Sequence, residues 1–317
     1  MSNGQIPTRI GPPVRVSVVI PTKGRPGIVQ RAVKSALGQT FRQLEVLVVV
    51  DGEDSETALA LESLNDPRLR IVKLANSVGA AEARNVGVRM AHADWIAFLD
   101  DDDEWLAHKL ERQFDCAIAA PALLPVVCSA YIGRSAEGDA PFGRRAPVPN
   151  EPVSDYMFCR RSLSYGENAL ATSVLFVPRE LMLSVPFDPE LRRHQDWDWA
   201  LRALNTSGVS LYYIADPLSV YYMADGAARL SVHDEWQYSL CWCRERKEFF
   251  TPKAFSFFIV TECITRARQA KASFRDIWVL LVAYWREGQP TFKSALLGLG
   301  YLIIPRSLRR LMLRFRH

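Results

Sequence analysis

Short apolar runs alternate with helical patterns through the first hundred residues, and this alternation constrains the fold more than any other feature. The runs at 16–20, 46–50, 69–74 and 95–99 have the length and near-continuous apolar character of strands buried on both faces. Segments 28–37, 57–64 and 80–90 place apolar residues at helical spacing between those runs. This order predicts an α/β fold with a mostly parallel sheet flanked by helices.

Polar loops follow three of the predicted strands. The Gly- and Pro-containing loop 22–27 follows the first strand, Asp51 the second, and the run Asp100–Asp103 the fourth. Ligands of open parallel sheets bind beyond the carboxyl ends of the strands. The sequence therefore predicts a site built from these three loops.

The middle of the chain carries weaker patterns. Residues 128–161 are rich in Gly, Pro and charge, which favours an irregular connection. We expect a strand at 172–177, a helix at 197–204 and a strand at 210–214.

The two ends of the chain differ from its body. Residues 1–13 contain Gly and Pro without periodicity and are expected to form a flexible leader. Beyond residue 235 the pattern becomes helical and aromatic. We therefore predict an α/β domain over 14–235 and a helical C-terminal extension over 236–317.

Positive charge is concentrated in the last segment. The formal net charge is +4, from 39 basic and 35 acidic residues in 317. Removing five C-terminal arginines leaves 34 basic residues against 35 acidic ones, so the body is nearly neutral. Those arginines are Arg306, Arg309, Arg310, Arg314 and Arg316. A neutral body argues against a nucleic-acid partner.

The sequence carries few signals of cellular location. Six scattered cysteines form no C-x-x-C pair, and the N-terminus lacks a basic-then-apolar signal, which favours reduced thiols and a cytoplasmic location. The longest apolar stretches, 277–285 and 295–304, reach about half of the roughly 20 residues that a spanning helix needs. No transmembrane helix is predicted.

Four consecutive aspartates follow the fourth predicted strand. Their mutual repulsion requires compensation by a cation or by solvent. Carboxylate oxygens suit Mg²⁺ or Mn²⁺, which bind through one or two carboxylates plus phosphate oxygens. A solvated acidic turn at a helix N-terminus accounts equally well for the run, so both interpretations stay open at this point.

The segment FLDDDDEW at 98–105 resembles the F-L-D-x-D-D-x-W form of the D-x-D region in inverting, GT-A-fold glycosyltransferases of family 2. Other segments follow in that family's order: VSVVIPTKGR at 16–25, VVVDG at 48–52, GAAEARNVG at 79–87 and QDWDW at 195–199. The resemblance covers some two-thirds of the chain. It implies a GT-A domain that binds a nucleoside-diphosphate sugar, usually a UDP-sugar.

The resemblance implies nucleotide-contacting roles for five residues. Pro21, Thr22 and Arg25 match the first nucleotide-contacting loop, and Asp51 matches the carboxylate that accepts a base N–H. Arg84 is implied to reach the nucleotide or its diphosphate. Arg25 and Arg84 can also be read as solvated surface residues, and Asp51 as a turn former.

The resemblance also implies a metal site. Asp100 and Asp102 form the D-x-D pair that meets the donor. Asp102 is the favoured direct ligand of a divalent Mg²⁺ or Mn²⁺ ion, and Asp103 is its close competitor.

Asp196 matches the aspartate that supplies the general base. The glutamate that usually precedes it is Gln195 here, which keeps an amide but removes a charge. Without the resemblance, Asp196 would be read as a helix N-cap. Trp197 and Trp199 follow it, and at least one of them is expected to lie in the core.

The implied function is transfer of a single sugar, with inversion, to a glycan or lipid-linked acceptor. Single transfer is favoured because the Q-x-x-R-W signature of processive synthases is missing. The alternative is a non-catalytic nucleotide-sugar-binding or scaffold protein. Gln195, in place of the usual glutamate, is the feature that favours this alternative.

The basic C-terminal tail allows two interpretations. Residues 295–304 are apolar, and Leu308, Leu311, Met312 and Phe315 then recur at helical spacing among the arginines. Such a segment suits the surface of an anionic membrane, which would place the protein peripherally at the inner face of the cell membrane in envelope polysaccharide biosynthesis. A helix docked on the protein with solvated arginines fits equally well.

Overall fold

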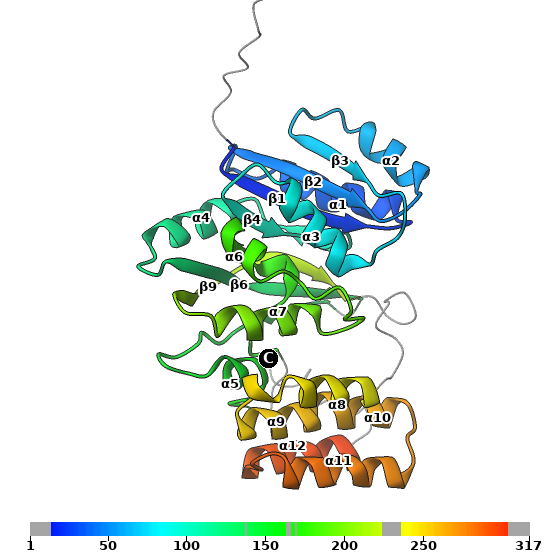
Figure 1. The fold of residues 1–317 in the computed structure, drawn as a ribbon, viewed down its shortest axis with the longest axis vertical. Helices are drawn as coiled ribbons and strands as arrows, with labels where there is room; N and C mark the ends of the chain where they lie inside the picture. Colours follow the sequence, from blue (N-terminus) through cyan, green and yellow to red (C-terminus); the bar gives the residue numbers. More distant parts are fainter. Residues whose placement is uncertain (1–13, 137, 163–165, 169, 224–235, 304–317) are drawn as a thin grey trace, which may run out of the picture.

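The computed structural model describes residues 14–136, 138–162, 166–168, 170–223 and 236–303 (Figure 1). The leader 1–13 and the arginines of the tail at 304–317 lie outside the described residues. The first four strands are β1 (Val16–Thr22), β2 (Leu44–Val50), β3 (Leu69–Lys73) and β4 (Trp95–Phe98). They pair in parallel in the order β3-β2-β1-β4, as the alternating pattern predicts.

Helices cover both faces of this parallel half. They are α1 (Pro26–Leu37), α2 (Ser55–Glu62), α3 (Ala80–Met90) and α4 (Lys109–Ala119). Because side chains alternate along a strand, Val18 joins the core under α1 and α4 while Val19 joins the core under α3. Every residue of β1 and β2 is buried, in agreement with their continuous apolar sequence.

The second half of the sheet is mixed. It contains β5 (Glu104–Trp105), β6 (Leu124–Ser135), β7 (Gly138–Phe142), β8 (Phe176–Pro178) and β9 (Val209–Tyr222). The short β8 runs antiparallel to both β4 and β6, whereas β6 and β9 are parallel. The helices α5 (Val153–Phe158), α6 (Arg179–Ser184) and α7 (Gln195–Leu204) belong to this half. The α/β fold class is confirmed.

Two sequence expectations need correction in this half. Residues 128–161 are not an irregular connection, because they contain most of β6, all of β7 and α5. The strand expected at 172–177 is a 3₁₀ turn at Thr172–Val174 followed by the start of β8. The first error arises because β7 is an exposed strand that exists by pairing with β6, not by its own apolar pattern. The second arises because a short apolar run does not by itself distinguish a buried turn from a buried strand.

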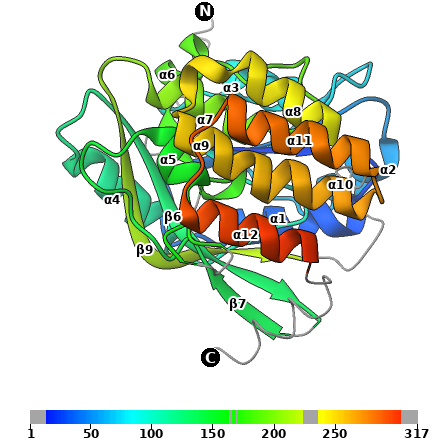
Figure 2. The same ribbon diagram turned by 90° about the horizontal axis from the view of Figure 1, so that it is seen from below.

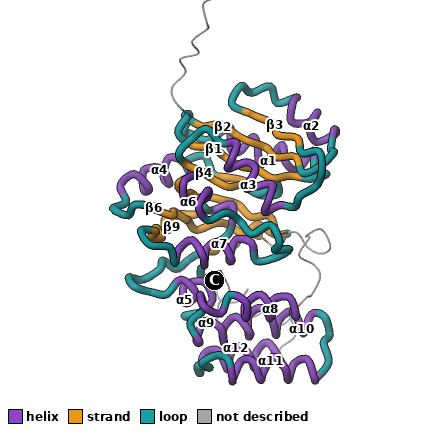
Figure 3. The backbone as a smooth tube through the Cα atoms, viewed as in Figure 1, coloured by secondary structure: helices purple, strands orange, loops and turns teal. Residues whose placement is uncertain are grey.

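The C-terminal part is helical, as expected. Its helices are α8 (Trp236–Glu245), α9 (Pro252–Phe258), a π-helical stretch (Ile259–Ile264), α10 (Thr265–Gln269), α11 (Phe274–Arg286) and α12 (Phe292–Ile303). Seen from below, α8, α9–α10, α11 and α12 lie across the end of the molecule (Figure 2). Figure 3 shows this helical part below the sheet, next to α5 and α7.

One apolar core joins the helical extension to the sheet. Phe98 of β4, Trp199 of α7 and Phe258 of α9 belong to the same buried cluster. The two parts of the chain, 14–235 and 236–317, therefore share one core. Their division into two domains stays a prediction. No helix within the described residues is long and apolar enough to cross a membrane.

Candidate active site

The acidic loop after β4 is tied to the loop after β1. Thr22 donates through Oγ1 to Asp101 Oδ2 at 2.7 Å, and Arg25 Nη1 lies 3.0 Å from Asp101 Oδ1 and 3.4 Å from Asp102 Oδ2. Burial raises the pKa of Asp101, as do the charges of Asp102 and Asp100, against the lowering by Thr22 and Arg25. The structure thus uses Thr22 and Arg25 to compensate the crowding of carboxylates.

Ser173 holds the other end of the acidic loop. Its Oγ donates to Asp103 Oδ2 at 2.7 Å and accepts from the Asp100 amide at 3.0 Å. Its carbonyl accepts from Trp105 Nε1 at 2.9 Å. Ser173 is fully buried in the 3₁₀ turn before β8, and Asp103 is 2% exposed. The carboxylate of Asp103 therefore faces the interior.

Asp102 is the open carboxylate of the run. Its side chain is 37% exposed, against 29% for Asp100 and 10% for Asp101. Arg31 of α1 donates to the Asp102 carbonyl at 2.6 Å, which fixes the backbone of the loop without occupying the carboxylate. Asp102 is therefore positioned by its backbone, and its carboxylate stays partly exposed beside Arg25, which lies 3.4 Å from its Oδ2.

Arg84 joins the acidic loop to α7. Its Nη2 lies 2.5 Å from Asp100 Oδ1, and its Nη1 donates to Gln195 Oε1 at 3.1 Å. The side chain is buried, with the guanidinium 5.6 Å from the Phe187 ring, and its Nε has no hydrogen-bond partner within the described part of the chain. A buried guanidinium in this position brings residues far apart in sequence to one site.

Asp196 lies at the second position of α7 beside this bridge. Its Oδ1 accepts from the Trp197 amide at 2.9 Å. Burial raises the pKa of Asp196 to about 6; the Asp100 charge adds to the increase, while the Trp197 amide and Arg84 oppose it. A half-buried carboxylate with a pKa near neutrality has the proton affinity of a general base.

Asp51 and Pro21 lie on the same edge of the sheet. Asp51 is buried and accepts from the amides of Val78 and Gly79 at 2.6 and 3.0 Å and from the Ser77 hydroxyl at 2.8 Å. The carboxylate thereby orders the loop that leads into α3. Pro21 is buried near the end of β1, next to Thr22.

The two tryptophans of α7 differ in burial, as expected. Trp199 is fully buried and donates through Nε1 to the Val185 carbonyl, so the expectation that one of the pair lies in the core is confirmed. Trp197 is half-buried and stacks on His194 at 4.9 Å between ring centroids. Neither ring is placed as a freely exposed carbohydrate platform.

The donor chemistry fits a divalent cation. Asp102 and Asp100 offer hard oxygen atoms, and Mg²⁺ needs only one or two carboxylates when substrate phosphates complete its shell. Within the described residues, no cluster of three or more His, Cys, Asp or Glu side chains could hold a metal. A metal here would therefore depend on the diphosphate.

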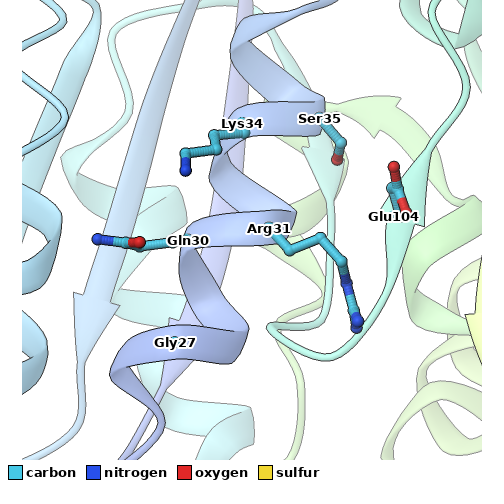
Figure 4. Close-up of a pocket in the computed structure, with 6 residues that line it drawn as sticks. All are labelled: Gly27, Gln30, Arg31, Lys34, Ser35 and Glu104. Atoms are coloured by element: carbon cyan, nitrogen blue, oxygen red, sulfur yellow. The ribbon is translucent and has the colours of Figure 1, made fainter.

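An open hollow of about 490 Å³ lies on the outer side of α1, next to the acidic loop. Figure 4 shows Gln30, Arg31 and Lys34 projecting from α1, with Glu104 on the neighbouring segment. Arg31 also stacks on the Tyr222 ring at 3.6 Å, and Tyr222 donates to Glu104 at 2.7 Å. None of the predicted site residues lines this hollow, which lies behind the loop that carries Asp102.

Residues 17–159 match the model of the family described as Glycosyl transferase family 2. The chain contains a family 2 glycosyltransferase domain. The matched range includes Asp51, Arg84 and the acidic loop, whereas Gln195 and Asp196 lie beyond it.

Curated relatives agree with this family 2 match. The chain is 25% identical over 282 residues to the amylovoran biosynthesis glycosyltransferase AmsB of Erwinia amylovora, covering 84% of this chain and 91% of that one. It is 35% identical over 98 residues to the UDP-Glc:alpha-D-GlcNAc-diphosphoundecaprenol beta-1,3-glucosyltransferase WfgD of Escherichia coli, spanning 31% of this chain and 39% of WfgD.

The structure of S. aureus TarS 1-349 in complex with UDP-GlcNAc matches with a TM-score of 0.51 and 17% identity. The match covers 91% of this chain and 79% of TarS 1-349. At this identity the likeness shows the GT-A fold alone.

The sequence analysis missed Ser173 and Arg31 as parts of the candidate site. Ser173 lies 70 residues from Asp103, and Arg31 lies 71 residues from the Asp102 carbonyl. A serine inside an apolar run was the one available signal for Ser173, and the helical pattern of α1 gave none for Arg31.

Ser173→Ala should lower the free energy of unfolding by about 1–3 kcal/mol, because the buried Asp103 carboxylate and the Asp100 amide each lose a partner. Urea unfolding followed by circular dichroism measures the change. Ser129→Ala is the matched control, since Ser129 is equally buried but its Oγ has no partner within the described residues. That control should not lower stability, because it removes a buried hydroxyl that has no partner among the described residues. An equal loss of stability in the two variants would contradict the role given to Ser173.

Proposed function

We propose that this chain transfers a single sugar from a nucleoside-diphosphate sugar, with inversion, to a glycan or lipid-linked acceptor. Asp196 acts as the general base, and the donor diphosphate lies against Asp100 and Asp102. A UDP-sugar is the proposed donor, because TarS structures in complex with UDP and with UDP-GlcNAc share this fold.

The observation that carries the proposal is the bridge from Asp100 through Arg84 to Gln195. It holds the acidic loop and the start of α7 together, so that the donor-side carboxylate and Asp196 belong to one site. The raised pKa of Asp196, about 6, supports the role of a base, whereas an N-cap carboxylate bound by several amides would be expected to stay acidic.

The reaction balances as a single displacement. The acceptor hydroxyl oxygen forms a bond to the anomeric carbon as the bond from that carbon to the diphosphate oxygen breaks. Asp196 takes the hydroxyl proton, and the nucleoside diphosphate leaves with the bonding electrons. Attack from the face opposite to the leaving group inverts the anomeric configuration.

The remaining residues bind and orient the donor. Arg84 places its guanidinium beside Asp100 and is proposed to bind a donor phosphate oxygen there. Asp102 is the proposed metal ligand because of its open carboxylate, and Asp103 is assigned to holding the loop because Ser173 binds it. A bound Mg²⁺ or Mn²⁺ ion supplies charge neutralisation for the leaving diphosphate.

Pro21, Thr22, Arg25 and Asp51 are proposed to shape the nucleotide pocket. Thr22 and Arg25 act by fixing the acidic loop, and Asp51 acts by ordering the loop at 77–79. For Asp51 to contact a nucleobase directly, one of its oxygens would have to give up a hydrogen bond from the loop at 77–79 or accept a second hydrogen bond beside it.

The acceptor proposal follows the relatives' names. AmsB and WfgD are named for amylovoran biosynthesis and for transfer to a diphosphoundecaprenol-linked sugar. We propose a related role in cell-envelope polysaccharide biosynthesis, at the cytoplasmic face of the cell membrane.

Asp196→Asn should lower kcat for sugar transfer by about 100-fold to 10,000-fold while donor affinity persists.

In the wild type, kcat/KM should fall as the pH drops below about 6, since protonation of Asp196 removes the base. Radiolabelled transfer assays across pH measure both, with donor affinity from calorimetry. Asp94→Asn, at an exposed position, is the control. A wild type without turnover of any donor would favour a non-catalytic nucleotide-sugar-binding protein.

Gln195→Glu should move the acidic limb of the kcat/KM profile to higher pH. A carboxylate at position 195 adds negative charge beside Asp196 and competes with Asp100 for Arg84, and both effects favour the protonated form of Asp196. Gln289→Glu introduces the same charge in the helical extension and should leave the limb in place. An unmoved limb in the first variant would argue against the placement of Asp196 as base.

UDP with Mn²⁺ should raise the thermal midpoint of the wild type more than UDP alone, because ligands that bind the native state stabilise it. Asp102→Asn should remove the metal-dependent part of that rise. Asp216→Asn is the control, because Asp216 is an exposed partner of Arg112. A metal-dependent rise that survives Asp102→Asn would remove Asp102 from the metal site.

A further inference from the structure

The outer surface of the helical extension gathers exposed aromatic residues. Phe274, Trp278 and Trp285 of α11 are 83%, 58% and 65% exposed, and Phe292 of α12 is 86% exposed. No other Phe or Trp of the described residues is exposed. A concentration of this kind marks an interaction surface, since isolated exposed apolar residues are ordinary but aromatic groups of them are not.

The exposed residues form a stripe on each helix. Residues 274, 278 and 285 follow one face of α11, while Leu280, Ala283 and Tyr284 of the same helix are buried. Residues 292, 296, 299 and 303 follow one face of α12 at intervals of four, three and four. Both helices are therefore apolar toward the protein and toward the outside, unlike ordinary surface helices. We call these two outward faces the apolar stripe.

The apolar stripe lies at one end of the molecule. Figure 1 places α11 and α12 at the opposite end from β3 and α2, and Figure 2 shows them from outside. Tyr284 of α11 and Ser294 of α12 share a hydrogen bond of 2.9 Å, which fixes the two helices to each other. The stripe is thus presented by a rigid pair of helices.

The charge of this segment of the sequence is positive. Residues 271–303 contain four basic and two acidic residues, a net charge of +2, and 304–317, outside the described residues, add five arginines, whereas residues 1–270 contain 30 basic and 33 acidic ones, a net charge of −3. The two acids are already engaged: Asp276 closes the capping box of α11, and Glu287 pairs with Arg244. The exposed Arg275, Arg286 and Lys293 adjoin the aromatic residues of the stripe.

We propose that the apolar stripe of α11 and α12 docks onto an anionic lipid bilayer. Phe and Trp side chains enter the headgroup region, where amphipathic aromatic rings are stable, and the surrounding cations meet lipid phosphates. At about 1.5 Å per residue, a helix of 13 residues is too short for a hydrocarbon core about 30 Å thick, so the helices lie in the interface.

The positive charge near the apolar stripe favours an anionic bilayer, rather than a second copy of the chain, as its binding partner. Self-association through the stripe would bring together two helix pairs that each carry a net positive charge, which opposes binding. An anionic membrane offers apolar and negative surface at once. The inference stands independently of the sugar transfer, because it needs neither donor nor acceptor.

The position of the stripe relates it to the candidate site. The helical extension contacts α7 directly, through His194 with Ser239 and through Asp198 with Arg246. Docking through α11 and α12 would therefore fix the orientation of α7 relative to the bilayer, because α8 and α9 lie between α7 and the two docking helices (Figure 1). A lipid-linked acceptor would reach the protein from that side.

Co-sedimentation of the full chain with vesicles tests the proposal, in the absence of any nucleotide sugar. We expect binding to vesicles of equal phosphatidylcholine and phosphatidylglycerol, and weaker binding to phosphatidylcholine alone. The variant F274S/W278S/W285S/F292S should lose more than about tenfold in partitioning. Its circular dichroism and thermal midpoint should match the wild type, since all four side chains are exposed.

The control variant L59S/I118S/L123S/L183S removes four exposed apolar side chains elsewhere and should bind like the wild type. Wild-type chain that stays in the supernatant would overturn the proposal, as would equal partitioning of the stripe variant. A stripe variant that changes from dimer to monomer in light scattering, without vesicle binding by the wild type, would assign the stripe to self-association instead. If replacing the five tail arginines by Gln abolishes binding while the stripe variant binds fully, the proposal also fails.

Discussion

Four carboxylates lie in a row at the end of one buried strand, and the site is built around compensating their mutual repulsion. Asp100 meets Arg84, Asp101 meets Thr22 and Arg25, and Asp103 meets Ser173. The partners come from the loop after β1, from α3 and from the 3₁₀ turn before β8. Asp102 alone keeps a substantially open carboxylate. The repulsion that makes the run costly thereby ties these elements to the end of β4, and it leaves one carboxylate available for a ligand.

The same constraint explains why Arg84 is buried. Burying a guanidinium without partners would cost free energy of folding, but that of Arg84 lies between the Asp100 carboxylate and the Gln195 amide oxygen. Gln195 accepts a hydrogen bond without adding a second negative charge, so Asp100 remains the main ionic partner of Arg84. The pKa of Asp196 then depends on burial and on Asp100 more than on its neighbour at position 195.

The sequence predicted the parallel half of the sheet well because that half is specified locally. Apolar runs buried on both faces and helices with one apolar face carry their pattern within a few residues, as α3 does at its predicted bounds. β7 carries no such pattern, since four of its five residues are exposed and its strand geometry comes from β6. The acidic loop was predicted from its place after the fourth strand, and Arg84 and Asp196 from the family resemblance. Ser173 and Arg31, which act across some 70 residues of sequence, carry neither signal and were not predicted.

The helical extension is part of the site rather than an appendage, and buried charge is the reason. Asp198 of α7 is fully buried, two residues after Asp196, and it accepts from Arg202 of its own helix and from Arg246 and Trp242 of the extension. Arg246 also reaches Asp188 at 2.9 Å, ahead of α7. Removing one partner of a buried ion pair costs about 3–5 kcal/mol, so a chain without α8 would leave Asp198 with Arg202 as its remaining ionic partner. The orientation of α7, and with it that of Asp196, therefore depends on residues that lie far beyond the family 2 match.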